Sequence, residues 1–335
     1  MKAYEIHPGE GFAGLTIVDR AAPALGAHDV RVRVHAVSLN YRDLVGVKNA
    51  GRLPRPIIPA SDGAGEVVAI GADVRRVAVG QRVAATFFPN WIEGEPTADT
   101  FAGALGGDVD GMLAEEVVLP ERAWVPIPSH LSYEEAATLP CAGVTAYAAL
   151  FVAASLRPGD SVLVQGSGGV SVFSLQLARA AGARVIATSS SADKRARLDK
   201  MGAEATIDYK ATPKWGDAAR AATGGRGVDV VVEVGGAGTL DQSIAAVRYA
   251  GTISLLGVLA GTSGQVNTYG IFRKSIKVHG VYVGSRKTFE DLLRALTVSG
   301  IRPVIDATFP FVDARAAFEH LASGKHFGKV VVKVA

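Results

Sequence analysis

A short apolar segment at 162–164 runs into the turn Gln165-Gly166-Ser167-Gly168-Gly169 and then directly into a helical segment, 172–181. Glycine lets such a turn close without a Cβ clash, so backbone N–H groups can approach a pyrophosphate at the positive end of the helix. The spacing Gly166-x-Gly168-x-x-Ser171 nearly meets the dinucleotide-binding fingerprint. A glycine turn by itself also suits plain packing of a helix on a strand, so the surrounding pattern has to decide.

The surrounding pattern alternates strand-like apolar runs with amphipathic helical runs, which is typical of βαβ units. The run 228–234, Val-Asp-Val-Val-Val-Glu-Val, has the near-continuous apolar character of a strand buried on both faces. We therefore predict a doubly wound parallel α/β sheet that binds a dinucleotide. The predicted strands are 161–165, 184–188, 205–208, 228–234, 251–257 and 277–283, and helices are predicted at 192–201 and 238–248, among others.

The end of the second predicted strand bears on the type of dinucleotide. A carboxylate that would hold the adenosine ribose is expected about 20 residues after the first glycine. The chain has Thr188-Ser189-Ser190-Ser191 there, followed by Lys194 and Arg195. Hydroxyls and positive charge suit a 2′-phosphate, which favours NADPH over NADH. The serines also suit the cap of the following helix, and one group can serve both purposes.

Composition limits the remaining possibilities. A length of 335 residues with 48% apolar content suits two domains, and no run approaches roughly 18 uninterrupted apolar residues. The first five residues lack the apolar core of a signal peptide, so a cytoplasmic protein without a membrane partner is expected. The single cysteine, Cys141, excludes an internal disulfide and a cysteine-based zinc cluster. A net charge of +3, without a basic block, gives no support for nucleic-acid binding.

The first 120 or so residues have a mainly β pattern, with short alternating runs broken by Gly and Pro. Val30, Val32 and Val34 alternate with Arg31 and Arg33, which predicts one buried and one solvated face. The segment 87–110 is rich in Gly, Pro, Asp and Thr and is predicted to be a long loop. Further strands are predicted at 65–70, 81–86, 113–119 and 124–127.

The whole chain resembles the medium-chain dehydrogenase/reductases. The matching segments occur in family order: Val37-Ser38-Leu39-Asn40-Tyr41-Arg42-Asp43-Leu44, Gly63-Ala64-Gly65-Glu66-Val67, Gly80-Gln81-Arg82-Val83, Cys141-Ala142-Gly143-Val144-Thr145-Ala146-Tyr147, the glycine turn and Gly328-Lys329-Val330-Val331. The resemblance implies a GroES-like catalytic domain at 1–124, a Rossmann domain at 125–275, and a segment at 276–335 that completes the Rossmann domain and returns to the catalytic domain. It also implies a homodimer.

Many members of this family hold a catalytic zinc ion, but the matching positions differ in this chain. Asn40 stands near the first ligand position, Ala60-Ser61-Asp62 replaces the Gly-His-Glu triplet, and Cys141 matches a ligand position. Zinc prefers several thiolate or imidazole ligands at once, so no metal site is expected. The structural zinc lobe of the family needs four cysteines where residues 87–110 contain none.

Without a metal to stabilise an alkoxide, reduction is more natural than oxidation of a simple alcohol. The chain is similar to zinc-free quinone oxidoreductases and enone reductases, which implies hydride transfer from NADPH to a small quinone, enone or related carbonyl. Within the family it resembles most the zinc-type alcohol-dehydrogenase-like members that carry Ser-Leu-Asn-Tyr-Arg-Asp-Leu, here residues 38–44. The resemblance implies that the catalytic residues Asn40, Tyr41 and Asp43 face the nicotinamide. Tyr41 is equally compatible with packing at a domain junction, Asp43 with a structural acceptor, and Cys141 with a buried small residue.

The expected cofactor contacts come from the glycine turn, the ends of successive strands and the resemblance. Ligands gather beyond the carboxyl ends of strands in open α/β sheets. The candidates are Thr145, Gly166, Ser167, Gly168, Gly169, Val170, Ser189, Ser190, Lys194, Tyr209, Gly235, Leu256, Val258, Val281, Tyr282 and Lys329.

Two alternatives stay open at this point. One is an NAD(P)-dependent alcohol dehydrogenase or aldehyde reductase, and the other is a protein that binds NADPH without turnover, because a fold does not guarantee its chemistry.

Overall fold

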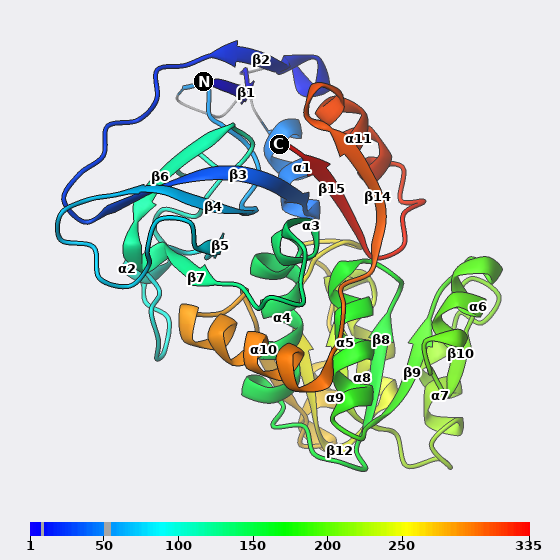
Figure 1. Cartoon of the computed structure of the whole chain (residues 1–335). Helices are drawn as coiled ribbons and strands as arrows, with labels where there is room; N and C mark the ends of the chain where they lie inside the picture. Colours follow the sequence, from blue (N-terminus) through cyan, green and yellow to red (C-terminus); the bar gives the residue numbers. More distant parts are fainter. Residues whose placement is uncertain (8–9, 50–54) are drawn as a thin grey trace. The chain divides into compact units, whose positions relative to one another are not determined.

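A computed structural model describes residues 1–7, 10–49 and 55–335, which form two compact units (Figure 1). The first unit comprises residues 1–144 and 284–335, and the second unit comprises residues 145–283. The family resemblance implied junctions at 124/125 and 275/276. The segment before residue 145 groups with the first unit because helix α3 (Tyr133–Ala137) packs on that unit's strands.

The second unit is built on a parallel sheet of six strands with the order β10-β9-β8-β11-β12-β13. This is the strand order of a doubly wound nucleotide-binding fold, in which the order reverses between β8 and β11. The α/β prediction for this part is therefore confirmed. The strands are β8 (Ser161–Gln165), β9 (Arg184–Thr188), β10 (Ala205–Ile207), β11 (Val228–Glu233), β12 (Val247–Leu255) and β13 (Lys277–Gly280).

Apolar strands and helices make the core of this unit, because β8 and β11 are buried along their whole lengths. Helix α8 ends at Ala246 rather than at the expected residue 248, because Val247 takes an extended backbone and pairs with Val228. The helices are α4 (Val144–Tyr147, which spans the junction), α5 (Gly169–Ala180), α6 (Ala192–Lys200), α7 (Trp215–Ala221), α8 (Leu240–Ala246) and α9 (Thr268–Arg273).

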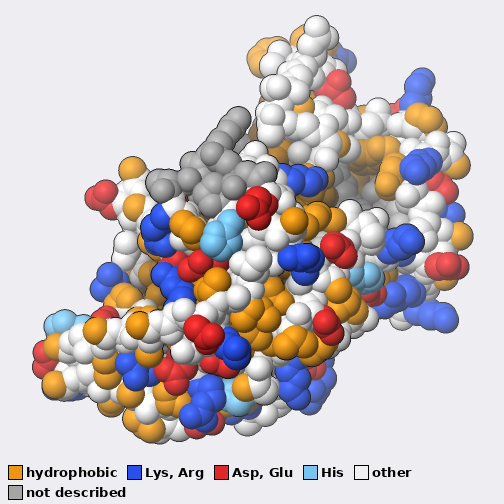
Figure 2. Space-filling view, turned by 90° about the horizontal axis from the view of Figure 1, so that it is seen from above, with side chains coloured by type: hydrophobic (Ala, Val, Ile, Leu, Met, Phe, Trp, Pro, Cys, Tyr) orange, Lys and Arg blue, Asp and Glu red, His pale blue; other side chains and the backbone are white. Residues whose placement is uncertain are grey.

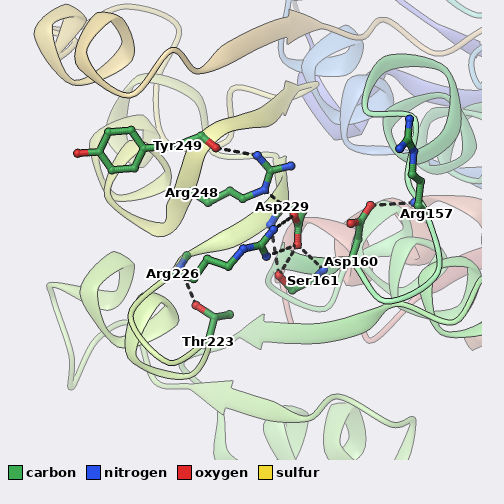
Figure 3. Close-up of polar contacts among 9 residues, drawn as sticks. Arg157, Asp160, Ser161, Thr223, Arg226, Asp229, Arg248 and Tyr249 are labelled. Carbon is green, nitrogen blue, oxygen red and sulfur yellow. Dashed lines mark hydrogen bonds and ion pairs between the residues drawn. The ribbon is translucent and has the colours of Figure 1, made fainter.

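A charged cluster ties together the starts of β8 and β11 at the amino edge of this sheet (Figure 3). The Asp229 carboxylate accepts from Arg226 and Arg248, at 2.7 Å and 2.5 Å, and from the Ser161 N–H and hydroxyl, both at 2.9 Å. Burial alone would raise the pKa of Asp229, but these hydrogen bonds outweigh burial and hold the pKa well below its usual range. The cluster lies at the edge opposite the carboxyl ends of the strands, and its bonds join β8, β11 and β12.

The first unit contains a seven-stranded sheet and a separate antiparallel pair, β1-β2. Six strands of the sheet follow the path β14-β15-β3-β4-β5-β7, and the seventh, β6, pairs with β3. Along one edge of β3, strand β6 pairs with residues 29–33 and strand β15 pairs with residues 36–39. The mainly β prediction is confirmed. The strands are β1 (Lys2–Ile6), β2 (Leu15–Asp19), β3 (Asp29–Leu39), β4 (Asp62–Ile70), β5 (Arg82–Ala85), β6 (Glu116–Pro120), β7 (Trp124–Pro126), β14 (Ile305–Pro310) and β15 (Lys329–Lys333).

Side chains along β3 point alternately to its two faces, so Val30, Val32 and Val34 are buried together. They join a core that includes Trp124 and Phe318. The long segment 87–110 contains one short helix and an aromatic cluster formed by Phe87, Phe88, Trp91 and Phe101. The helices of the unit are α1 (Tyr41–Lys48), α2 (Ala98–Phe101), α3, α10 (Arg286–Ser299) and α11 (Ala314–Ala322).

Charged side chains of both signs are interspersed on the face drawn in Figure 2, without a continuous basic area. Of the helices within the described ranges, none combines the length and the apolar character needed to cross a bilayer.

Candidate functional site

The glycine turn lies at the carboxyl end of β8, beside the point where the strand order of the second unit reverses. Gly166 has a φ of +74°, which a side chain would strain. A Cβ added at Gly166 or Gly168 would meet no heavy atom within 4 Å, so the turn borders open space. Gly168 caps α5 without a side-chain hydrogen bond, which leaves the first amides of the helix available to an anion. This geometry fits the pyrophosphate of a dinucleotide.

Ser171 takes the place of the third glycine in the fingerprint. Its side chain is buried, and its hydroxyl donates to the Gln165 carbonyl at 2.6 Å. The hydroxyl therefore joins the first turn of α5 to the end of β8. A residue larger than glycine is accommodated here because its polar atom has a partner inside the strand-to-helix junction.

A second polar network, which the sequence analysis missed, joins β8 to β11 at the same edge. The Glu233 carboxylate is fully buried and accepts from the Gly235 and Gly236 N–H groups at 2.7 Å and 3.0 Å, and from Gln165 Nε2 at 2.6 Å. The hydroxyls of Thr239 and Ser243 also donate to Glu233. These bonds fix the loop after β11 against the glycine turn. Glu233 was visible in the sequence as a charge at the end of an apolar strand.

The serine segment after β9 forms the cap that the sequence analysis considered. The Ser191 hydroxyl accepts from the Lys194 N–H at 3.3 Å, and Ser189 is buried. Arg195 donates to the Ser189 carbonyl and to Asp208, both at 2.8 Å. This places a guanidinium and several hydroxyl groups at the carboxyl end of β9, where a 2′-phosphate would need donors.

Except for Thr145, the remaining cofactor candidates of the second unit lie beyond the carboxyl ends of its strands. The loops after β11 and β12 contact each other closely: the Leu259 N–H donates to Val234 and the Ala260 N–H to Gly235. The added Cβ of Gly236 would meet Val258 Cα at 2.9 Å. The structure thus brings Gly235 and Val258 together at one edge. Leu256 follows β12, Val281 and Tyr282 follow β13, Tyr209 follows β10 as an exposed residue, and Thr145 is buried in α4.

In the first unit, three strand ends bring distant residues into one buried polar cluster. Val330 pairs with Leu39, which places Lys329, at the start of β15, beside Asn40, just after β3. Asp62 at the start of β4 pairs with Ser38 near the same end of β3. Its carboxylate accepts from the Cys141 N–H at 2.9 Å, which adds the π-helical turn Leu139–Gly143.

Lys329 is only 3% exposed, and its ammonium is the centre of this cluster. The Nζ atom donates to the Leu39 carbonyl at 2.7 Å and to Asn40 Oδ1 at 2.5 Å. Burial lowers the pKa of Lys329, an effect that the negative charge of Asp62 opposes most strongly. The resemblance implied that Lys329 contacts the cofactor. In the structure its ammonium instead binds the Leu39 carbonyl and the side-chain oxygen of Asn40.

Two carboxylates share the cluster, and both are almost completely buried. Asp43 accepts from the Asn40 N–H at 2.7 Å, while its Oδ1 has no hydrogen-bond partner within the described ranges. Burial raises the pKa of Asp43 to about 6, against the lowering effects of Arg42 and of the Asn40 N–H. Burial also raises the pKa of Asp62, partly offset by Lys329, then by Ser61, Cys141 and the Asn40 amide. Tyr41, by contrast, is 48% exposed at the start of α1.

Asn40, Asp62 and Cys141 of this cluster stand at positions that the family resemblance matched to catalytic zinc ligands, but the residues present do not fit that ion. Zinc prefers several thiolate or imidazole ligands, and this cluster offers a single thiol, that of Cys141, whose pKa is raised by burial and by the nearby Asp62. Asn40 and Ser61 contribute an amide and a hydroxyl, and the Lys329 ammonium already supplies a positive charge among them. No group of three His, Cys, Asp or Glu side chains suited to a metal occurs in the part of the chain that the structure describes.

Comparisons with known proteins agree with this architecture. Residues 26–129 match the family described as alcohol dehydrogenase GroES-like domain, and residues 169–298 match the family described as zinc-binding dehydrogenase. A zinc-type alcohol dehydrogenase-like protein of Schizosaccharomyces pombe (strain 972 / ATCC 24843) is 43% identical over 92% of this chain and 92% of its own length.

A quinone oxidoreductase-like protein 2 homolog of Nematostella vectensis is 30% identical over 92% of this chain and 82% of its own length. Among solved structures, that of an NAD-dependent alcohol dehydrogenase superposes with a TM-score of 0.91 at 33% identity, covering 100% of both chains. With its GroES-like and parallel-sheet domains and these relatives, the chain belongs to the medium-chain dehydrogenase/reductase superfamily and is an oxidoreductase of the alcohol dehydrogenase or quinone oxidoreductase kind.

Proposed function

We propose that this protein is a zinc-independent oxidoreductase that uses NADPH to reduce a quinone, an enone or a related carbonyl compound. The observation that carries the proposal is the buried ammonium of Lys329, which lies among Asn40, Asp62 and Cys141, the residues that the resemblance matched to metal-ligand positions. A fixed positive charge and amide donors suit the stabilisation of developing negative charge on oxygen without a metal.

The chemistry of the acceptor follows from this arrangement. NADPH, when bound, supplies the hydride, and a conjugated acceptor moves the resulting negative charge onto an oxygen atom. The chain's own residues then need only to orient that acceptor and bind its oxygen. The cradle of Gly166 and Gly168 supports the binding of a pyridine nucleotide. Asn40, Asp43 and Tyr41 remain the proposed catalytic residues.

A turnover assay tests this proposal. Protein treated with a chelator is mixed with NADPH and a panel of quinones, enones, aldehydes and alcohols, with NADH and NADP⁺ in parallel wells. We expect oxidation of NADPH with conjugated acceptors and no increase on addition of zinc. Activity that appears only with zinc would favour an alcohol dehydrogenase, and cofactor binding without turnover of any acceptor would favour a binding protein.

The preference for NADPH rests on the groups after β9. Ser189, Ser190, Lys194 and Arg195 supply hydroxyls and positive charge where a ribose-binding carboxylate would stand for NADH. We expect Lys194→Ala to weaken NADPH binding more than NADH binding in fluorescence titrations. Lys200→Ala, at the exposed end of the same helix, is the matched control. An equal loss for both cofactors in the Lys194 variant would argue against a 2′-phosphate contact.

We also propose a cytoplasmic homodimer. The edge strand β13 of the second unit supports the dimer, because all four of its residues are exposed and one of its sides has no strand partner among the described residues. Such an edge is available for pairing with another strand. Light scattering should give a dimer for the wild type and a monomer for Val278→Lys on β13. Val298→Lys, on the exposed surface of α10, is the control and should stay dimeric. A monomeric wild type would refute the dimer.

A further inference from the structure

The side chain of Asn40 has a defined orientation because of its neighbour. An ammonium group only donates hydrogen bonds, so the atom that Asn40 places 2.5 Å from Lys329 Nζ is its carbonyl oxygen. The NH₂ group of Asn40 therefore faces the other way. It has no hydrogen-bond partner in the described residues, although Asn40 is only 7% exposed.

A buried donor without an acceptor destabilises the free protein and is uncommon in native structures. The Asn40 amide lowers the pKa of the Asp62 carboxylate as a hydrogen-bond donor, but no Asp62 oxygen makes a hydrogen bond of good geometry with it, and these oxygens accept from Ser61 and from the Cys141 N–H. The capping box at the start of α1 uses the Asn40 side chain only as an acceptor for the backbone N–H of Asp43, so it does not engage the NH₂ group. The NH₂ group of Asn40 therefore lacks a well-placed acceptor among the described residues, and an oxygen atom of a ligand would supply one.

We propose that Lys329 is a positioning residue: by binding the Asn40 carbonyl oxygen, it directs the Asn40 NH₂ group to the oxygen of the acceptor that is being reduced. This inference rests on the proposed reductase function and assigns the donor within that same site. Asn40 is the catalytic residue of the pair, because its NH₂ group would touch the substrate, and Lys329 acts through it.

The charge changes during reduction explain why such a donor helps. In an enone, the hydride adds to the β-carbon, and the electron pair of the C=C bond shifts so that the carbonyl oxygen becomes an enolate oxygen. The α-carbon then takes a proton from solvent. A hydrogen bond to that oxygen strengthens as the charge develops, and the ammonium on the amide oxygen polarises the NH₂ group further.

A double-mutant cycle separates this role from a direct contact between Lys329 and the cofactor. Asn40→Leu removes the donor, and we expect kcat to fall about 100-fold, the usual effect of losing one such donor. Lys329→Met frees the amide to rotate and should lower kcat at least 10-fold, with KM for NADPH changed less than about 3-fold. The double variant should be no slower than Asn40→Leu, because residues that act through one another are not additive.

Two further variants keep the test informative. Lys329→Arg retains a donating cation and should recover part of kcat, and Lys333→Met, at the exposed end of β15, is the matched control that should leave kcat unchanged. Circular dichroism confirms folding of each variant. Additive losses in the double variant, or a Lys329→Met effect confined to KM for NADPH, would overturn the inference and indicate a cofactor contact instead.

A binding experiment gives a readout that does not depend on turnover. The anion of 4-nitrophenol is a probe whose oxygen resembles an enolate oxygen, and its absorbance reports binding. We expect the wild type to bind it at least 10-fold more tightly than Asn40→Leu and Lys329→Met do. Equal binding by all three proteins would overturn the inference. If the probe binds as expected while the wild type reduces no acceptor, the donor role stands and the proposed reductase activity fails.

Discussion

The buried carboxylate of Asp43 makes the stability of the first unit depend on pH in an unusual direction. Its pKa of about 6 in the folded protein lies above the value of about 3.9 for an unfolded aspartate. The folded state therefore holds the proton more tightly than the unfolded state does. The stabilisation from this group is fully present below about pH 4 and is lost as the pH rises through about 6.

The magnitude follows from the two pKa values. Between pH 4.5 and pH 7.5, the contribution of Asp43 to the free energy of unfolding should fall by about 2 kcal/mol. In Asp43→Asn this titration is absent, while the other groups remain. The difference in unfolding free energy between wild type and Asp43→Asn should therefore shift by about 2 kcal/mol, against the wild type, over this range.

Urea denaturation followed by tryptophan fluorescence measures this difference. The chain has three tryptophans, of which Trp215 belongs to the second unit, so a Trp215→Phe background lets Trp91 and Trp124 report on the first unit. Asp99→Asn, at an exposed carboxylate of the same unit, controls for the loss of one charge. A difference that stays constant from pH 4.5 to 7.5, or that moves in favour of the wild type as the pH rises, would refute the argument.

Three other perturbations have defined outcomes. Gly166→Ala should destabilise the second unit by about 1 kcal/mol, because alanine is strained at a φ of +74°, and it should weaken pyridine nucleotide binding in a fluorescence titration. Ser171→Ala removes the bond to the Gln165 carbonyl and should lower the unfolding free energy by about 1 kcal/mol in urea. Asp229→Asn should cost about 2 kcal/mol at pH 7; because the folded pKa is depressed, the wild-type advantage should shrink as the pH falls below about 4 in the same urea assay.

Periodicity was sufficient to predict most elements of the second unit. The predicted strands 161–165 and 184–188 coincide with β8 and β9. Short continuous apolar runs between helical runs indicate buried strands of a parallel sheet. The glycine turn could also be predicted from the sequence, because its conformation depends on residues that are adjacent in the chain. Element ends were less certain: the strand predicted at 277–283 ends at Gly280, and the one predicted at 251–257 begins at Val247.

The buried cluster of the first unit was only partly predictable. Asn40 and Lys329 were both singled out, but 289 residues separate them, and only the register of β15 against β3 makes them neighbours. Asp62 was noted as a departure from a metal ligand, whereas its contact with the Cys141 N–H depends on the turn at 139–143. Glu233 was missed because its partners lie on β8, on α8 and in the loop after β11.

Transfer of deuterium from the cofactor tests the central claim most directly. Chelator-treated protein is incubated with NADPH that carries deuterium at both C4 positions and with an enone, and the product is analysed by mass spectrometry. The account predicts one deuterium atom at the β-carbon of the saturated product, formed at the same rate with and without added zinc. A product without deuterium, or deuterium transfer only after zinc is added, would contradict a zinc-independent NADPH reductase.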